Sequence, residues 1–169
     1  MGSTAVKTLL IVYHSMTDGT RQMAAAAAAG AGSEAPTVHT RLLHASDAGP
    51  GDVLAADGYL FATPENLGSM SGLMKDFFDR SYYAALDRIN GRPYAAMVCA
   101  GSDGHGAVRQ IERIATGWRL KAVADALIVC TRAQTPEQIL RTKQIAPQDL
   151  ARCEALGNAV AAGLGLGVF

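Results

Sequence analysis

The sequence predicts an α/β fold in which a parallel sheet is covered by helices on both faces. Short apolar runs alternate with longer helical segments along the chain, and this alternation is typical of βαβ units. The first run, Lys7–Tyr13, is apolar without interruption after its first two residues, as expected for a strand buried on both faces. The 169 residues and the hydrophobic content of 49% suit one domain with a core of its own. We therefore expect a single domain over residues 1–169.

The next segments alternate between helix and strand. The alanine-rich segment from Thr20 predicts a helix, because alanine is the best helix former and its small side chain allows close packing. Residues 37–43 alternate apolar and polar side chains, which predicts a second strand nearer an edge of the sheet. Residues 46–56 contain a proline and two glycines before a short helical tail, and residues 57–63 predict a third strand.

The strongest amphipathic pattern lies at Met70–Leu86, where we expect a helix. Its apolar stripe consists of Leu73, Met74, Phe77 and Phe78. Two further strands are predicted at Pro93–Ala100 and Val123–Cys130. Helices are predicted from the glycine loop 101–106 to about residue 117, at 136–142 and at 147–164. Five strands in this arrangement favour a flavodoxin-like three-layer sandwich, an α/β fold whose five-stranded parallel sheet has the order 2-1-3-4-5 and helices on both faces.

The composition excludes several classes of protein. Lys and Arg number 15, as do Asp and Glu, so the formal charge is zero and a nucleic-acid partner is not expected. The 3 cysteines form no CxxC motif and the 4 histidines no cluster, which argues against a disulfide framework and against a metal site. No apolar run is long enough for a signal peptide or a membrane span. We expect a cytoplasmic protein with no membrane partner.

Three loops rich in Gly, Ser, Thr and Asn follow the first, third and fourth predicted strands, at residues 14–20, 64–70 and 101–106. In the order 2-1-3-4-5 these loops meet in the ligand crevice at the carboxyl ends of the strands. The first loop offers hydroxyl groups and the start of a helix, which together suit a phosphate. The chain contains neither a Gly-Lys pair nor GxGxxG, so this is no Walker or dinucleotide loop. A plain Ser/Thr-capped helix start would show the same residues, and the loop chemistry alone leaves both readings open.

Two segments resemble known flavoproteins. Residues 15–20 (SMTDGT) resemble the phosphate loop of flavodoxins, S/T-x-T-G-x-T. Residues 63–80 (TPENLGSMSGLMKDFFDR) are similar to the flavin loop and following helix of NAD(P)H-dependent FMN reductases and Trp-repressor-binding-protein-like quinone reductases. At the level of the fold the resemblance covers the whole chain.

The resemblance implies an FMN site built from the three loops. The phosphate would be held by Ser15, Met16, Thr17, Asp18, Gly19 and Thr20. The flavin ring would be flanked, mostly through backbone groups, by Pro64, Glu65, Asn66, Leu67, Gly68 and Ser69. The third loop would contribute Ser102, Asp103, Gly104 and His105. One departure is Asp18, which stands where the family has glycine. An acid beside a phosphate is unfavourable unless it points to solvent or is offset, for example by Arg21.

The implied function is that of an FMN-binding oxidoreductase that passes electrons from NAD(P)H through FMN to a quinone or another small acceptor. Neither the second nor the third loop contains an aromatic residue, so one face of the ring would be open to a stacking partner. Tyr82, Tyr83 or Trp118 could still supply an aromatic ring. Hydride transfer depends on proximity and alignment, so no catalytic triad is expected and no catalytic residue is assigned.

Two other functions remain open at this stage. The first is a flavodoxin-type electron carrier that docks on a protein partner, although the balanced charge counts against it. The second is a flavin-free flavodoxin fold with a structural or regulatory role, which Asp18 would favour. Cys99 and Cys130 fall inside predicted strands, where we expect them to behave as small core hydrophobes. Residues 131–146 could cover the site or form a contact in a homo-oligomer.

Overall fold

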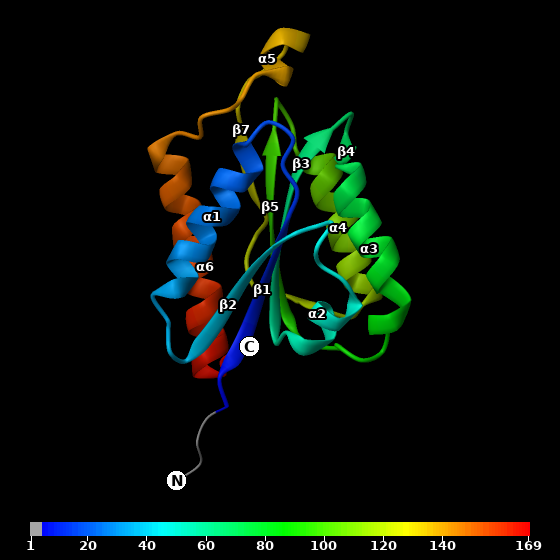
Figure 1. Ribbon diagram of the computed structural model, residues 1–169, viewed down its shortest axis with the longest axis vertical. Helices are drawn as coiled ribbons and strands as arrows, with labels where there is room; N and C mark the ends of the chain where they lie inside the picture. Colours follow the sequence, from blue (N-terminus) through cyan, green and yellow to red (C-terminus); the bar gives the residue numbers. More distant parts are fainter. Residues whose placement is uncertain (1–4) are drawn as a thin grey trace.

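The computed structural model describes residues 5–169, which form a sheet between two layers of helices (Figure 1). The parallel strands are β1 (Lys7–Tyr13), β2 (Val38–His44), β3 (Gly58–Asn66), β5 (Pro93–Ala100), β6 (Lys121–Ala122) and β7 (Leu127–Cys130). The short strand β4 (Ser69–Met70) pairs antiparallel with the end of β3. The helices are α1 (Gly19–Gly32), α2 (Pro50–Ala55), α3 (Gly72–Ala85), α4 (His105–Gly117), α5 (Pro136–Leu140) and α6 (Pro147–Leu166). No helix among these is long and apolar enough to cross a membrane.

The strand order is β2-β1-β3-β5-β6, and β7 also pairs with β5. Since β6 and β7 together take the place of the fifth predicted strand, the order 2-1-3-4-5 is confirmed, with β2 at an edge. In β1, Leu9 and Ile11 face one helical layer and Leu10 and Val12 face the other, all of them fully buried. The uninterrupted apolar run therefore reflects burial on both faces of the sheet.

Helices α1 and α6 form one layer and cross each other at very short range. A Cβ atom at Gly30 would lie 1.9 Å from the carbonyl oxygen of Glu154, and one at Gly157 would lie 1.9 Å from that of Ala27. These distances leave no room for any side chain at either glycine. The alanine-rich sequence of α1 thus allows close packing against α6 as well as against the sheet.

Helices α2, α3 and α4 cover the other face (Figure 1). Met74, Phe77 and Phe78 of α3 are buried there, but Leu73 is 43% exposed, so its place in the predicted stripe was wrong. The helix begins at Gly72, and Leu73 lies in its first turn outside the buried face. The ring of Trp118 is fully buried against the core.

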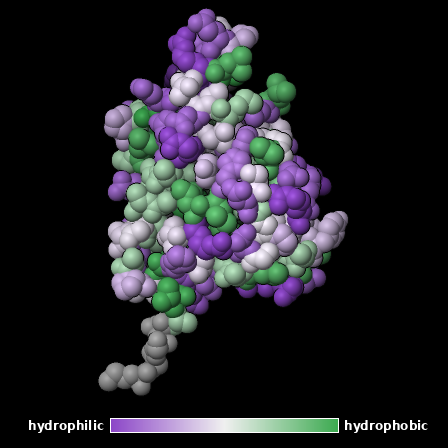
Figure 2. Space-filling view, viewed as in Figure 1, coloured by the Kyte–Doolittle hydropathy of each residue, from purple (hydrophilic) through white to green (hydrophobic). Residues whose placement is uncertain are grey.

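Of the predicted fifth strand, Val123–Cys130, only Leu127–Cys130 forms a strand, and β6 lies just before the predicted start. The backbone N–H of Val123 still donates to the carbonyl of Tyr94, but residues 124–126 leave the ladder, and Asp125 within them is exposed. A strand at the edge has a neighbour on one side only, so a polar residue can break its pairing at little cost. The short helix predicted at residues 136–142 is confirmed as α5, which projects beyond the sheet and carries mainly hydrophilic side chains on the face shown in Figure 2.

Candidate functional site

A cleft of about 480 Å³ opens at the carboxyl ends of β1, β3 and β5. The first loop contributes Ser15, Met16, Thr17, Gly19 and Thr20, and the second contributes Pro64, Glu65, Asn66, Leu67 and Gly68. The end of β5 and the third loop contribute Cys99, Ala100, Gly101 and Ser102. The remaining wall consists of Thr131, Ala133, Gln134, Ile139, Leu140 and Lys143. The three predicted loops therefore do meet in one cleft.

Some of the predicted site residues lie beside this cleft rather than in its wall. They are Asp18, Ser69, Asp103, Gly104 and His105. The side chains of Asp103 and His105 are exposed and joined by a hydrogen bond of 2.7 Å between Oδ1 and Nδ1. This hydrogen bond lowers the pKa of the Asp103 carboxyl. The two side chains of the third loop thus bond to each other on the solvent side of the loop and not in the cleft.

The first loop joins β1 to α1 and presents hydroxyl groups without partners. The Oγ atom of Ser15 and the Oγ1 atom of Thr20 are buried, and neither has a hydrogen-bond partner within the described residues. Buried hydroxyls are normally satisfied, so a pair left open beside a cleft indicates a missing acceptor or donor. Thr20 lies in the first turn of α1 and Ser15 in the loop that leads into it, and backbone N–H groups and the helix dipole at this end of α1 favour an anion.

Asp18 turns away from the cleft. Its backbone has a φ of 75°, and its carboxylate accepts hydrogen bonds from Arg21 and from Nε2 of Gln22, the latter at 3.1 Å. The hydrogen bond from Arg21 lowers the pKa of the Asp18 carboxyl, which is therefore ionised and paired. The negative charge of Asp18 is thus offset by the neighbouring guanidinium of Arg21.

The second loop is a tight β-hairpin, which the sequence did not predict. Glu65 pairs with Met70 and Asn66 with Ser69, and the turn between them consists of Leu67 and Gly68. Both turn residues have positive φ, 51° and 76°, as hairpin turns of this kind require. Asn-Gly is the usual sequence signal for such a turn, and Leu-Gly does not predict one. Leu67 is fully exposed at the tip, on the rim of the cleft.

The hairpin is fixed to the start of α4 by side-chain hydrogen bonds. The Glu65 carboxylate accepts from the backbone N–H of Gly104 at 2.9 Å and from that of Ala107 at 3.0 Å. Oε1 of Gln110 accepts from the backbone N–H of Met70 at 2.8 Å. The negatively charged Glu65 side chain thus binds the amino terminus of α4, where the helix dipole stabilises a negative charge. The second and third loops form one connected unit.

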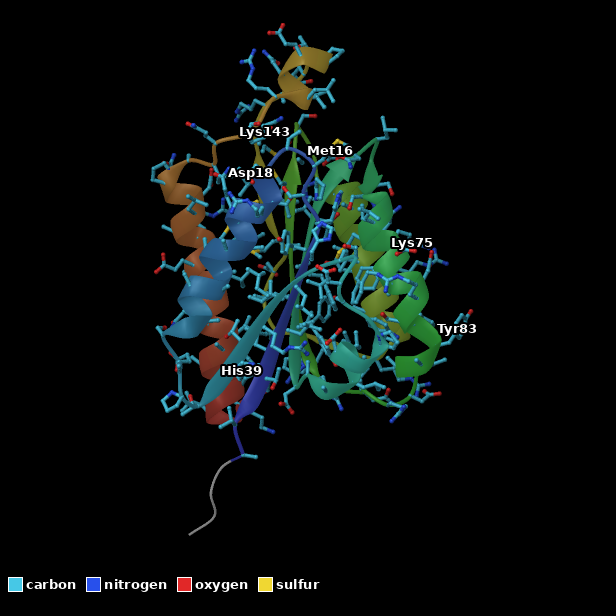
Figure 3. The ribbon with its side chains drawn as sticks, viewed as in Figure 1. Met16, Asp18, His39, Lys75, Tyr83 and Lys143 are labelled. Atoms are coloured by element: carbon cyan, nitrogen blue, oxygen red, sulfur yellow. The ribbon has the colours of Figure 1, made fainter. Side chains whose placement is uncertain are left out.

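The fourth wall of the cleft comes from residues 131–146, the segment that was expected either to cover the site or to form an oligomer contact, but the sequence did not single out Lys143 within it. Lys143 approaches the first loop from a segment that we call the strap, residues 139–145. Its backbone N–H donates to the carbonyl of Thr17 at 2.8 Å, and its Nζ lies 3.4 Å from Oγ1 of Thr17. Figure 3 shows Lys143 near Asp18 and Met16 at the upper end of the molecule. Lys143 and Thr17 are 126 positions apart, and no local pattern signals such a contact.

The cysteines differ from one another in exposure. Cys99 lies in the cleft wall and is 8% exposed, and its burial raises the thiol pKa to about 11. Cys130 is exposed at the end of β7, so the expectation that it behaves as a core residue was wrong. It lies at the end of an edge strand, where alternate side chains face solvent. Within residues 5–169 no group of three or more His, Cys, Asp and Glu residues could hold a metal ion.

The other aromatic candidates do not reach the cleft. Trp118 is fully buried, and the ring of Tyr82 stacks on it with a centroid distance of 5.7 Å. Tyr83 points away from the body of the molecule on α3 (Figure 3). The described cleft wall therefore contains no aromatic side chain.

A doubly wound parallel sheet of this order, with a hydroxyl-rich loop at the start of its first helix, defines the flavodoxin-like class of α/β proteins, which bind ligands in this crevice. Within that class, the chain belongs to the NADPH-dependent FMN reductase family, whose sequence model matches residues 7–133. Membership of this family indicates FMN as the cofactor.

Two relatives match parts of the chain. A flavodoxin of Aquifex aeolicus is 37% identical over 58% of this chain and 52% of its own length. An NAD(P)H dehydrogenase (quinone) of Acidithiobacillus ferrooxidans is 33% identical over 43% of this chain and 46% of its own. The chain therefore spans about half the length of each relative.

Solved structures share the fold. An archaeal flavodoxin superimposes with a TM-score of 0.74 at 18% identity, covering 93% of this chain and 98% of that one. A WrbA-like flavodoxin from Agrobacterium tumefaciens gives a TM-score of 0.72 at 19% identity, with 95% and 98% covered. At sequence identities this low, the similarity to these structures establishes the fold alone.

Proposed function

We propose that the cleft holds FMN and that the protein is an oxidoreductase that passes electrons from NAD(P)H through FMN to a quinone or another small acceptor. The observation that carries the proposal is the pair of buried hydroxyls of Ser15 and Thr20, which have no partner within residues 5–169. A phosphate at the amino terminus of α1 would satisfy both hydroxyls.

The residues present fit FMN. Ser15, Thr17 and Thr20 would hold the phosphate together with the first backbone N–H groups of α1. The β3–β4 hairpin and the third loop would flank the ring, and their connection through Glu65 keeps the distance between them fixed. When bound, FMN supplies the capacity to accept a hydride and to pass on its electrons.

The protein's own part in such a reaction would be to bind the flavin and to orient a second flat molecule against it. The cleft wall contains no aromatic side chain among the described residues, so one face of a bound ring would stay open to a flat molecule. Met16, Leu67 and Leu140 form an apolar rim, and each is more than half exposed. Such a rim would favour a nicotinamide or quinone ring over water. The relative named NAD(P)H dehydrogenase (quinone) supports this assignment.

A second function is that of an electron carrier that docks on another protein. The relative named flavodoxin supports it, since it is the more similar of the two at 37% identity. The balanced charge of 15 basic and 15 acidic residues counts against it, because docking carriers depend on a strong electrostatic field.

Titration with FMN tests the proposal. We expect quenching of flavin fluorescence with one FMN per chain. Thr17→Asp would place a carboxylate at the phosphate, and two like charges about 4 Å apart repel by about 4 kcal/mol near a protein surface. FMN affinity should fall at least ~100-fold. Thr116→Asp, an exposed threonine on α4, is the matched control and should bind FMN normally.

Anaerobic reduction then separates the two functions. Rapid bleaching of the flavin by NADH or NADPH, followed by reoxidation with a soluble quinone, would support the oxidoreductase. Slow reduction by both nucleotides together with fast reduction by a reductase protein would support the carrier. A wild-type protein that does not change the fluorescence of FMN would refute both.

A further inference from the structure

We infer that Lys143 is the cation that neutralises the FMN phosphate, so that this side chain makes the cleft select FMN over unphosphorylated flavin. The inference rests on the proposed function and adds a specificity-determining residue outside the three loops. Its basis is the contact between the strap and the first loop, where Nζ of Lys143 lies 3.4 Å from Oγ1 of Thr17.

The charges around the cleft leave this role to Lys143. Among the described residues of the cleft wall it is the only cation, and Glu65 is the only anion. The Glu65 carboxylate is directed to the backbone N–H groups at the start of α4. Arg21, the cation that directly follows the first loop in the sequence, is paired with Asp18. Within residues 5–169 the ammonium of Lys143 has no carboxylate partner, so its charge is available to a phosphate dianion at the first loop.

The ammonium group is already held in place. It donates to the carbonyl of Ile139 at 2.8 Å and to that of Arg141 at 2.6 Å, both in the strap itself. These two bonds and the contact with Thr17 fix Nζ beside the Thr17 hydroxyl in the first loop. A cation that is ordered before the ligand arrives loses little conformational entropy on binding.

The strap is attached to α1 through one side chain. Nε2 of Gln22 donates to the carbonyl of Lys143 at 2.8 Å, and its Oε1 accepts from the backbone N–H of Ile145 at 3.0 Å. The backbone N–H of Lys143 donates to the carbonyl of Thr17. The position of the lysine relative to the first loop is thus determined by hydrogen bonds on both sides of it.

The test compares FMN and riboflavin, which differ by the phosphate alone. Binding of each is measured by flavin fluorescence for the wild type, for Lys143→Gln and for Arg141→Gln. Arg141 is the matched control, because it lies in the same strap and its side chain pairs with Glu137 outside the cleft. Loss of the electrostatic attraction between the ammonium and the phosphate should weaken FMN binding by Lys143→Gln about 10- to 100-fold. Riboflavin affinity should stay within about twofold, and Arg141→Gln should match the wild type.

Two outcomes would overturn the inference while the proposed function stands. One is FMN affinity of Lys143→Gln equal to that of the wild type. The other is an equal loss of FMN and riboflavin, which would give Lys143 a purely structural role. If Lys143→Gln does not fold, Lys143→Met is measured in the same way and the same two outcomes apply. A wild type that binds neither flavin would refute the proposed function itself.

Discussion

Replacing Glu65 by alanine should both destabilise the protein and weaken FMN binding. The carboxylate accepts hydrogen bonds at 2.9 Å and 3.0 Å from the N–H groups of Gly104 and Ala107. Hydrogen bonds to charged groups contribute about 1.5–3 kcal/mol each, and water replaces part of the loss at a half-buried position. We expect the free energy of unfolding to fall by about 2–4 kcal/mol. Flavin affinity should fall as well, because the hairpin and the third loop lose their connection.

Urea denaturation followed by circular dichroism measures this loss, and flavin titration measures the affinity. Glu65→Gln should lose roughly half as much stability, since the amide keeps one accepting oxygen but turns an NH₂ group toward the second N–H. Glu112→Ala on the exposed side of α4 is the control and should change stability by less than about 0.5 kcal/mol. A Glu65→Ala protein as stable as this control would show that the two hydrogen bonds do not hold the loops together.

Two further predictions concern packing and thiol reactivity. Gly157→Ala places a methyl group 1.9 Å from a backbone carbonyl of α1, so the helices must separate and the free energy of unfolding should fall by about 1–3 kcal/mol or more. Gly32→Ala meets no atom of residues 5–169 within 4 Å and should be neutral or stabilising when both variants are compared by urea denaturation, so equal loss of stability in the two variants would contradict the packing. A maleimide probe at pH 7 should modify one thiol per native chain, at Cys130, because Cys99 and Cys153 are buried and burial raises the pKa of each to about 11. Mass spectrometry of the labelled peptides checks this, and rapid labelling of Cys99 would show that the cleft wall opens.

The central strands were predictable because each buries both faces. Lys7–Tyr13 and Pro93–Ala100 have the predicted bounds, since continuous apolar runs stop where burial stops. The edge strand was predicted less well. It is paired on one side only, and the run around Asp125 could leave the ladder without exposing a core. The local sequence therefore predicted the bounds of a strand best where the strand is buried on both faces of the sheet.

The site was predictable as far as it depends on short loops between successive elements. Loops at the carboxyl ends of neighbouring parallel strands lie close together, so the strand order alone predicts where they meet. This is how Ser15, Pro64 and Ser102 could be assigned to one cleft. The hairpin was missed because Leu67 stands where asparagine would have signalled the turn. Lys143 was missed because its position depends on how the chain returns after β7, and no sequence period encodes that return.

The cleft is built from segments near both ends of the chain. Gln22 in the first helix fixes the strap that enters just before the last helix, so the wall beside the first loop is completed after nearly all other elements. During synthesis, the first three loops can leave the ribosome and fold onto the sheet while this wall is still missing. Any fragment that ends before the strap keeps the hydroxyl groups and lacks the cation. The binding site is therefore complete only once the strap has been synthesised and has reached the first loop.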